Sequence, residues 1–379
     1  MSPLPDVRPR SVSPAPPIAC LECATYLVPT DRAEADGTLA WSSTTVVAVT
    51  ARAGDTSGLG WTYGSRASQV VVETELVKAV DGSDPMDVPG ASESMIRACR
   101  NLGRPGVVSS AISAVDIALW DLKAKLLGLP LVQLFGRCRE RVPVYGSGGF
   151  TAYADEVTSE QLRGWVDAGI PRVKIKIGES WGTAAERDLE RVALTRKVVG
   201  DDVDILVDAN GGYSRKQAIR IGRRLAEDYG VVWFEEPVSS DDLAGLREVR
   251  DQLTTDVAAG EYGYDDGYFA RMVAAEAVDC LQIDVTRCGG YTVWLRAAAI
   301  AGAHHLDVSA HCAPSLHTPV AAAVPNLRHI EYFHDHSRLE ALLFDGAASP
   351  VGGALVPHND APGHGLALRA RDAEQYRVA

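Results

Sequence analysis

The sequence predicts an α/β protein whose larger part is a closed parallel barrel, preceded by a smaller α+β unit. From about residue 140, eight short apolar segments recur at regular intervals, and amphipathic stretches of helix length separate them. Eight alternating β and α units in about 200 residues favour a closed barrel over an open doubly wound sheet. No GxGxxG or GxxxxGK[ST] motif follows any of these segments, which disfavours a dinucleotide or P-loop fold.

Each barrel strand is predicted from a short run rich in β-branched or aromatic residues. The expected strands are 142–150, 172–178, 204–210, 231–237, 256–262, 280–287, 307–313 and 327–333. Between them lie helical patterns such as AAERDLERVALTRKVV at 184–199 and RKQAIRIGRRLAEDY at 215–229.

The N-terminal region predicts strands first and helices after. Strands are expected at 44–53 and 57–63, and helical spacing of apolar residues follows at 92–102 and 108–128. We expect a disordered lead-in at 1–18, an α+β unit at 19–125, the barrel at 126–345 and a C-terminal segment, 346–379, that returns to the N-terminal unit.

The composition excludes some classes of partner. A formal net charge of −13 and a pI near 5.2 argue against non-specific binding to nucleic acid or to an anionic membrane. No apolar run is long enough to span a bilayer, and the Pro-rich N-terminus lacks the apolar core of a signal peptide.

The cysteines suit a reducing compartment. Seven cysteines without regular spacing fit the cytoplasm. Cys20 and Cys23 form a lone CxxC with no second pair nearby, so two ordinary cysteines at the start of a strand are a better interpretation than a metal or redox site.

The segment RVKIKIG, residues 172–178, carries two lysines on one face of a strand. Side chains of a strand alternate between faces, so Lys174 and Lys176 point the same way. Lysine is rarely buried unless it is paired. Either this is a solvated strand, or the interior of the barrel requires two ammonium groups.

Ionisable groups recur at the carboxyl ends of the other expected strands, where barrel enzymes build their active sites. Any one of them alone is explained by helix capping or a solvated loop, but independent capping does not predict the regularity. Asp208, Glu235 and Glu261 form an oxygen-ligand set suited to Mg²⁺. Glu236 is expected to face away from Glu235, so that one glutamate of the pair is a ligand.

Two candidate bases flank this metal site. Lys174 and the metal are expected to lower the pKa of Lys176 and make it a base near neutral pH. His311 is expected to be held in one tautomer by Asp284. Two bases at a Mg²⁺ site suit removal of a proton from the carbon next to a carboxylate.

Glu331, on the last expected strand, lies where negative charge develops, and an acid helps there only when protonated. Burial beside other carboxylates is expected to keep it protonated. A pairing of Glu331 with Arg328 or Arg338 is an equally good interpretation.

These residues resemble the enolase superfamily, specifically the mandelate racemase/muconate lactonizing enzyme group. The matching stretches are SAISAVDIALWDLKAKLLGLPLVQLFG, VKIKIG, DAN, WFEEP, GE, DVTRCGG, SAHCAPSLH and IEYF, in family order between about 110 and 335. The resemblance implies a modified (β/α)7β TIM barrel and an α+β capping domain formed by the N-terminal region and the C-terminal tail.

The resemblance also implies a role for each site residue. Lys174 binds the substrate carboxylate, Lys176 is the catalytic base, and His311 with Asp284 is a dyad. Glu331 is the electrophilic acid, and the Mg²⁺ ligands are the three carboxylates already named. Asn210 is a further substrate-binding candidate beside them.

The substrate is less well specified. In this family the cap selects the substrate, and the polar loop 25–41, which includes Tyr26 and Arg32, suits a hydroxylated acid, although a solvated loop tip explains its polarity equally well. Members with this full set of residues are often acid sugar dehydratases, which yield 2-keto-3-deoxy acids. A racemase or epimerase of an α-hydroxy acid is the alternative.

Other classes fit less well. A metal-dependent hydrolase on the same barrel is disfavoured because the first strand lacks a His-x-His pair, and a non-catalytic binding protein because the ionisable set is intact. The expected partner is a small carboxylate, with no nucleic acid and no membrane, and we expect a homo-oligomer.

Overall fold

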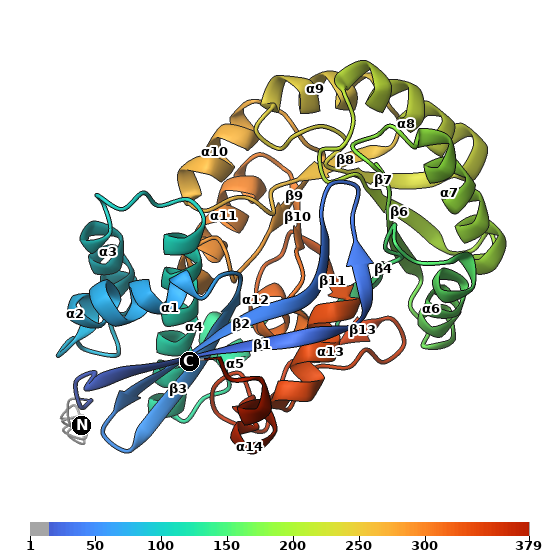
Figure 1. The fold of residues 1–379 in the computed structure, drawn as a ribbon. Helices are drawn as coiled ribbons and strands as arrows, with labels where there is room; N and C mark the ends of the chain where they lie inside the picture. Colours follow the sequence, from blue (N-terminus) through green and yellow to red (C-terminus); the bar gives the residue numbers. More distant parts are fainter. Residues whose placement is uncertain (1–14, 379) are drawn as a thin grey trace, which may run out of the picture.

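A closed parallel barrel forms the larger part of the computed structural model, which describes residues 15–378. The strands follow the order β11-β10-β9-β8-β7-β6-β5-β4, and β11 pairs with β4 to close the barrel. Helices surround it, as Figure 1 shows from green to orange. The expected fold class, a TIM barrel of the enolase superfamily type with an N-terminal capping region, is confirmed.

The barrel strands lie within the segments predicted for them. They are β4 (Val142–Gly148), β5 (Arg172–Lys176), β6 (Asp204–Asp208), β7 (Val231–Glu235), β8 (Asp256–Ala259), β9 (Cys280–Ile283), β10 (Asp307–Ala310) and β11 (Leu327–Phe333). The helices between and after them are α6 (Asp155–Asp167), α7 (Ala185–Val199), α8 (Arg215–Tyr229), α9 (Leu243–Gln252), α10 (Asp266–Ala274), α11 (Gly290–Ala303), α12 (Pro314–Ala321) and α13 (His334–Leu343).

The N-terminal cap is a three-stranded antiparallel sheet covered by helices. Its elements are β1 (Cys20–Ala35), β2 (Ala40–Ala53), β3 (Thr56–Tyr63), α1 (Ala67–Val71), a π-helical turn (Val72–Leu76), α2 (Val77–Val80), α3 (Val88–Ala98), α4 (Val107–Leu127) and α5 (Leu131–Phe135). Helix α4 approaches β3 closely because Gly58 has no side chain: a Cβ there would lie 2.1 Å from the carbonyl oxygen of Ala118.

A long hairpin of β1 and β2 reaches from the cap over the mouth of the barrel (Figure 1). The stretch 25–41, expected to be a loop, is therefore mostly strand. The register of β1 against β2 shifts between Pro29 and Glu34, and this irregularity bends the hairpin. At its tip, Gly37 O accepts a hydrogen bond from Trp181 N at 3.0 Å, and Asp36 O accepts one from Thr151 Oγ1 at 2.6 Å.

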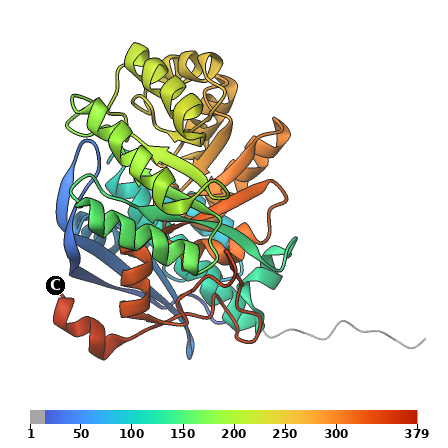
Figure 2. The same ribbon diagram turned by 90° about the vertical axis from the view of Figure 1, so that its right-hand side faces the viewer.

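The C-terminal segment runs along the barrel and ends beside the cap. Strand β13 (Ala354–Leu355) pairs with β4, and β14 (Ala367–Leu368) pairs with β12 (Phe344–Asp345). After α14 (Ala370–Ala373) and a 3₁₀ turn (Glu374–Tyr376), Val378 N donates to Thr25 O at 3.0 Å. Figure 2 shows this red segment beside the blue strands of the cap.

The predicted lead-in at 1–18 lies mostly outside the described residues. Of its described part, Ile18 is buried and its N–H donates to Ser83 O at 2.9 Å. Cys20 opens β1, and both Cys20 and Cys23 are free thiols. Within residues 15–378, no helix combines the length and the apolar character needed to cross a membrane.

Candidate active site

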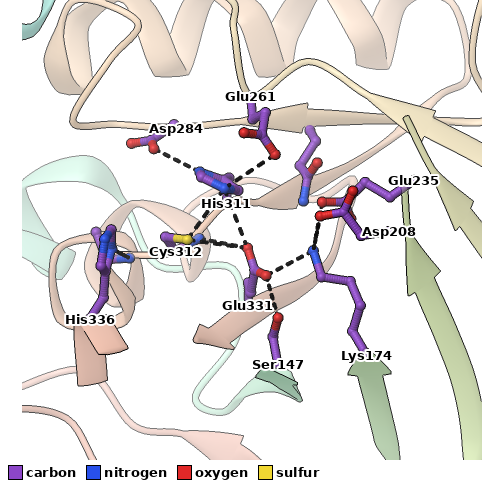
Figure 3. Close-up of polar contacts among 12 residues, drawn as sticks. Ser147, Lys174, Asp208, Glu235, Glu261, Asp284, His311, Cys312, Glu331 and His336 are labelled. Carbon is purple, nitrogen blue, oxygen red and sulfur yellow. Dashed lines mark hydrogen bonds and ion pairs between the residues drawn. The ribbon is translucent and has the colours of Figure 1, made fainter. Parts of the chain in front are cut away.

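Three carboxylates meet at the carboxyl end of the barrel strands. Asp208 and Glu235 are the last residues of β6 and β7 and lie side by side in the ladder. Glu261 follows β8 after Gly260, whose φ of +136° and contact with the Gln282 carbonyl leave no room for a side chain. One oxygen from each carboxylate lies within 4.8 Å of the others, and Figure 3 shows the group from β6 to β8.

The two lysines of β5 lie on the inner side of the strand beside these acids. Lys174 Nζ lies 2.6 Å from Glu235 Oε1 and 2.8 Å from Glu331 Oε1, and its side chain is fully buried. Lys176 pairs with Asp208 and also faces the cavity. The ammonium groups are thus paired, which answers the burial question that RVKIKIG raises.

The pKa of Lys176 differs from the expectation. Burial lowers this pKa and Lys174 lowers it further, but Asp208 and Glu261 more than offset both, so the pKa is raised above its ordinary value. The prediction of a lowered pKa therefore does not hold for the protein chain alone.

His311 follows β10 and is oriented by Asp284, as the sequence suggested. His311 Nδ1 lies 2.8 Å from Asp284 Oδ2, and Nε2 lies 3.4 Å from Glu261 Oε2 (Figure 3). Burial lowers the pKa of His311, but Glu261 and the bond to Asp284 outweigh it, so the pKa is raised. The arrangement favours a proton on both ring nitrogens.

The surroundings of Glu331 in the chain without metal favour its carboxylate form, whereas a protonated acid was expected. Burial raises its pKa, but Lys174 and His311 more than offset this and hold the pKa well below its usual range. Glu331 Oε1 also accepts a hydrogen bond from Ser147 Oγ at 2.6 Å. The alternative pairing is wrong as well, because Arg328 pairs with Asp256 and Asp307, and Arg338 pairs with Asp335.

Glu236 does not face away from the site as expected. Strand β7 ends at Glu235, and Glu236 has a φ of +39°, so the alternation of a strand no longer applies. Its side chain is buried, and burial together with Glu261 and Asp208 raises its pKa well above the ordinary value. Glu236 therefore lies beside the carboxylate group.

The carboxylate group fits a hard divalent cation. Among the described residues, Glu261 Oε2 and Glu236 Oε1 are buried oxygens with no hydrogen-bond partner. Burial raises the pKa of Glu235 to about 8, with Asp208 and Glu331 adding to this, although Lys174 opposes it. An oxygen-only donor set with unsatisfied buried oxygens suits Mg²⁺.

A cavity of about 300 Å³ lies between the barrel mouth and the cap. Lys176, Asn210, Glu261 and His311 line it, so the structure brings these sequence-predicted residues together. Lys174 contacts Glu235 and is fully buried, and it is not among the residues that line the cavity.

Two cap residues predicted to bind substrate lie elsewhere. Tyr26 is buried beside the C-terminal segment, where it bridges to Arg377, and Arg32 is exposed on the hairpin. Neither residue lines the cavity, so the structure does not bring them together with the other predicted site residues. Polarity alone did not reveal which face of the hairpin turns inward.

Sequence reasoning missed several neighbours of the site. Ser147 is the next-to-last residue of β4, at the same edge as the other strand-end groups, so the same rule would have found it. Cys312 Sγ lies 3.3 Å from His311 Nε2, and His336 follows β11; both line the cavity (Figure 3). Cys312 has a φ of +53°, which no strand pattern indicates.

Family models match most of the chain. The model of the mandelate racemase/muconate lactonizing enzyme N-terminal domain matches residues 25–136, and that of the enolase C-terminal domain-like family matches residues 157–373. The first match covers the cap, and the second covers all the site residues after β4.

Curated relatives point the same way. The chain is 32% identical to an L-talarate/galactarate dehydratase of Salmonella typhimurium over 280 residues, which are 73% of this chain and 69% of that protein. It is also 32% identical to an arabinonate dehydratase of Saccharolobus solfataricus over 327 residues, 83% of this chain and 85% of that protein.

Solved structures share the fold over almost the whole chain. A mandelate racemase/muconate lactonizing enzyme-like protein from Rubrobacter xylanophilus is 48% identical with a TM-score of 0.93, covering 96% of this chain and 100% of the other. A racemase from Streptomyces coelicolor with bound magnesium is 29% identical with a TM-score of 0.90, covering 95% and 100%. The chain belongs to the mandelate racemase/muconate lactonizing enzyme family of the enolase superfamily.

Proposed function

We propose that the protein is a Mg²⁺-dependent carbon–oxygen lyase that dehydrates an acid sugar to a 2-keto-3-deoxy acid. One observation carries the proposal: Lys176 on β5 and His311 after β10 face the same cavity, next to the carboxylate group. The two residues come from strands separated by β4 and β11, so they approach a bound substrate from different sides.

The residues that would hold Mg²⁺ are Asp208, Glu235 and Glu261. When bound there, the ion supplies positive charge that neutralises these carboxylates, lowers the pKa of Lys176 and favours the enediolate form of the substrate. Family members with bound magnesium support this assignment.

The protein's own residues account for both proton transfers. Lys176 removes the proton from the carbon next to the substrate carboxylate, and the electron pair of that C–H bond enters the new C=C bond. His311 gives the proton on Nε2 to the departing β-hydroxyl, which leaves as water. The enol product then tautomerises to the keto acid, while Asp284 holds the Nδ1 proton of His311.

Two of the proposed site residues act on other residues. Ser147 donates a hydrogen bond to Glu331, Glu331 pairs with Lys174, and Lys174 in turn balances the charge of Glu235. Asn210 remains a candidate contact for the substrate because its Oδ1 is buried without a partner among the described residues and its side chain lines the cavity.

Incubation with Mg²⁺ and a panel of acid sugars tests the proposal. Dehydration yields a keto acid that semicarbazide traps, and we expect this signal with at least one sugar and its loss in Lys176→Ala. Exchange of the α-proton in D₂O without keto acid, across a broad panel, would contradict dehydration.

A racemase or epimerase is the second candidate, because Lys176 and His311 could each serve as a base on one face of the substrate. This activity would produce deuterium exchange and a stereoisomer but no keto acid. A non-catalytic binding protein would show no exchange with any bound acid.

We also propose that the protein is a homo-oligomer. Leu39 at the hairpin tip is 65% exposed and Trp181 in the loop after β5 is 68% exposed, and their segments are hydrogen-bonded to each other. Large apolar side chains gathered on a surface suit a protein interface. Light scattering of the purified protein would give its mass, and a monomer would contradict this proposal.

We propose a cytoplasmic location as well. The seven cysteines are free in the structure, although Cys20 and Cys23 lie close in sequence, which suits a reducing compartment. Fractionation of cells that produce the full chain would test this, and recovery of the protein outside the cytoplasmic fraction would contradict it.

A further inference from the structure

The charges that line the cavity are distributed unevenly between its two ends. Four basic side chains line it, Lys176, Arg287, His311 and His336, and the first three lie near the metal-binding end. Each of these three contacts an acid: Lys176 pairs with Asp208, Arg287 Nη1 lies 3.1 Å from Glu261 Oε1, and His311 bonds to Asp284. These three basic side chains are therefore already paired with acids, near the end of the cavity where the reacting carboxylate of the substrate is proposed to bind.

The opposite side of the cavity is formed by the cap, and we call it the cap wall; it includes Asp36, Trp41, Thr44, Thr45 and Tyr63. Among the described cap residues that line the cavity, Asp36 is the single charged one. The cap wall therefore offers hydroxyl groups and aromatic edges, and it presents no cation to a ligand.

Asp36 is held rigidly with one oxygen free. Its Oδ1 accepts hydrogen bonds from Thr38 N at 2.6 Å and from Leu39 N at 2.7 Å, which fixes the turn at the tip of the hairpin. Within residues 15–378, no cationic side chain forms an ion pair with Asp36, and its Oδ2 is available to accept a hydrogen bond from a hydroxyl.

The barrel contributes two further groups beside the cap wall. Asp335 is buried, with Oδ1 bound to Arg338 at 2.7 Å and Oδ2 accepting from Thr44 Oγ1 at 2.5 Å. His336 accepts a hydrogen bond from Ala313 N at Nδ1, and burial lowers its pKa to about 4. The ring is therefore neutral near pH 7, and its proton lies on Nε2.

We propose that the substrate is an aldonic acid, with one carboxylate and a terminal hydroxymethyl group, and that Asp36 excludes aldaric acids, which carry a carboxylate at both ends. This inference rests on the proposed function and goes further by naming the class of acid sugar. A second carboxylate would face the unpaired charge of Asp36 without a cation to compensate it, whereas a hydroxyl donates to Asp36. Of the two curated relatives described above, one is named for aldaric acids, talarate and galactarate, and the other for an aldonic acid, arabinonate.

Matched substrate pairs test the proposal with the Mg²⁺-loaded enzyme. We compare D-gluconate with D-glucarate and D-galactonate with galactarate, and measure both keto acid formation and binding by calorimetry. The proposal expects kcat/KM, or affinity where turnover is absent, to be at least about tenfold higher for an aldonate than for its aldarate. Equal or reversed preference overturns it.

The two measurements separate the two proposals. Keto acid from aldarates but not from aldonates overturns the aldonate assignment and leaves dehydration standing. Preferential binding of aldonates without keto acid contradicts dehydration and supports the charge preference of the cap wall. Binding of neither class overturns both.

Asp36→Asn tests the role of the residue itself. Asparagine keeps the acceptor oxygen that fixes the turn and removes the charge, so we expect the aldarate-to-aldonate ratio of kcat/KM to rise by about tenfold. Asp31→Asn is the matched control, because Asp31 lies on the same hairpin, contacts His334 and does not line the cavity. An unchanged ratio in Asp36→Asn, or an equal rise in the control, overturns the proposal.

Discussion

His311 presents a single nitrogen to the cavity. Asp284 occupies Nδ1, so Nε2 is the atom that faces the substrate side, with Cys312 Sγ and Glu261 Oε2 nearby. The raised pKa of His311 means that Nε2 carries a proton over a wider pH range than in a free histidine. This residue is therefore suited to act as a general acid.

Replacement of His311 by asparagine tests that role. We expect His311→Asn to reduce dehydration by about 10²–10⁴-fold, the usual contribution of a general acid, while Mg²⁺ binding and the circular dichroism spectrum stay close to the wild type. Keto acid formation measured with trapped product checks this. Unchanged turnover would remove His311 from the mechanism.

At the scale of residues, the sequence pattern predicted where side chains lie better than it predicted their protonation states. The spacing of Lys174 and Lys176 placed both inside the barrel, and the strand-end rule found Asp208 and Glu235. The pKa directions of Lys176 and Glu331 in the chain without metal differ from an interpretation of the local sequence, because a pKa depends on neighbours from distant segments.

At the scale of elements, the hairpin of β1 and β2 brings the cap to the active site. A Cβ on Gly37 would lie 2.6 Å from the carbonyl oxygens of both Ile177 and Gly178, directly after the strand that carries Lys176. The tip of the hairpin therefore packs directly against the backbone of the loop after β5. This contact joins segments about 140 residues apart, so no local sequence pattern reveals it.

Substitution of Gly37 tests the importance of this contact. We expect Gly37→Ala to lift the tip and lower kcat/KM by at least about tenfold, because Asp36 and Trp41 move away from the cavity. Gly164→Ala is the control. A Cβ there meets no atom within 4 Å, and the substitution should stabilise helix α6 by about 0.5–1 kcal/mol. Similar kinetics in the two variants would contradict the prediction.

Glu34 in β1 gives the hairpin a dependence on pH. Burial, with Asp335 and Asp31, raises its pKa to about 8, although Trp41 donates to it at 2.9 Å. The folded state therefore keeps a proton between about pH 4.5 and 8 that the unfolded state has lost. Its contribution to stability is present at the acidic end of this window and declines as the pH rises through it.

Removal of the Glu34 carboxyl group should reduce the dependence of the free energy of unfolding on pH. We expect the free energy of unfolding of the wild type to fall between pH 5 and 8, and Glu34→Gln to reduce that fall by about 1 kcal/mol or more. Denaturant titrations of both proteins at pH 5, 6.5 and 8 measure the difference. Parallel profiles would show that Glu34 is ionised in the folded protein.

At the scale of the whole molecule, the barrel was predictable and the cap was predicted only in outline. The eight barrel strands repeat one local pattern, so errors were confined to strand ends, as at Glu236. The position of the cap over the barrel depends on contacts such as Thr151 with Asp36, which arise from tertiary packing. For that reason the sequence did not reveal that Tyr26 and Arg32 lie away from the cavity, which Asn210 lines.

Magnesium should stabilise the entire protein if the carboxylate group binds it. At a concentration 100 times the dissociation constant, a ligand of the folded state contributes about 2.7 kcal/mol, so we expect Mg²⁺ to raise the melting temperature and EDTA to reverse the shift. Glu261→Gln should weaken the shift, as measured by calorimetry. A full shift in that variant would place the ion elsewhere.

The bend in β1 between Pro29 and Glu34 allows substrate selection by the hairpin tip to vary independently of proton transfer by the barrel. The proton-transfer groups are held by the strand pairing of the barrel. Asp36, in contrast, lies at the tip of the hairpin, just after the point where the register of β1 against β2 shifts. Insertions or substitutions between 30 and 39 can therefore change which acid is accepted without moving Lys176 or His311. A graft of this short segment from a relative with another preference would transfer selectivity and leave the chemistry in place.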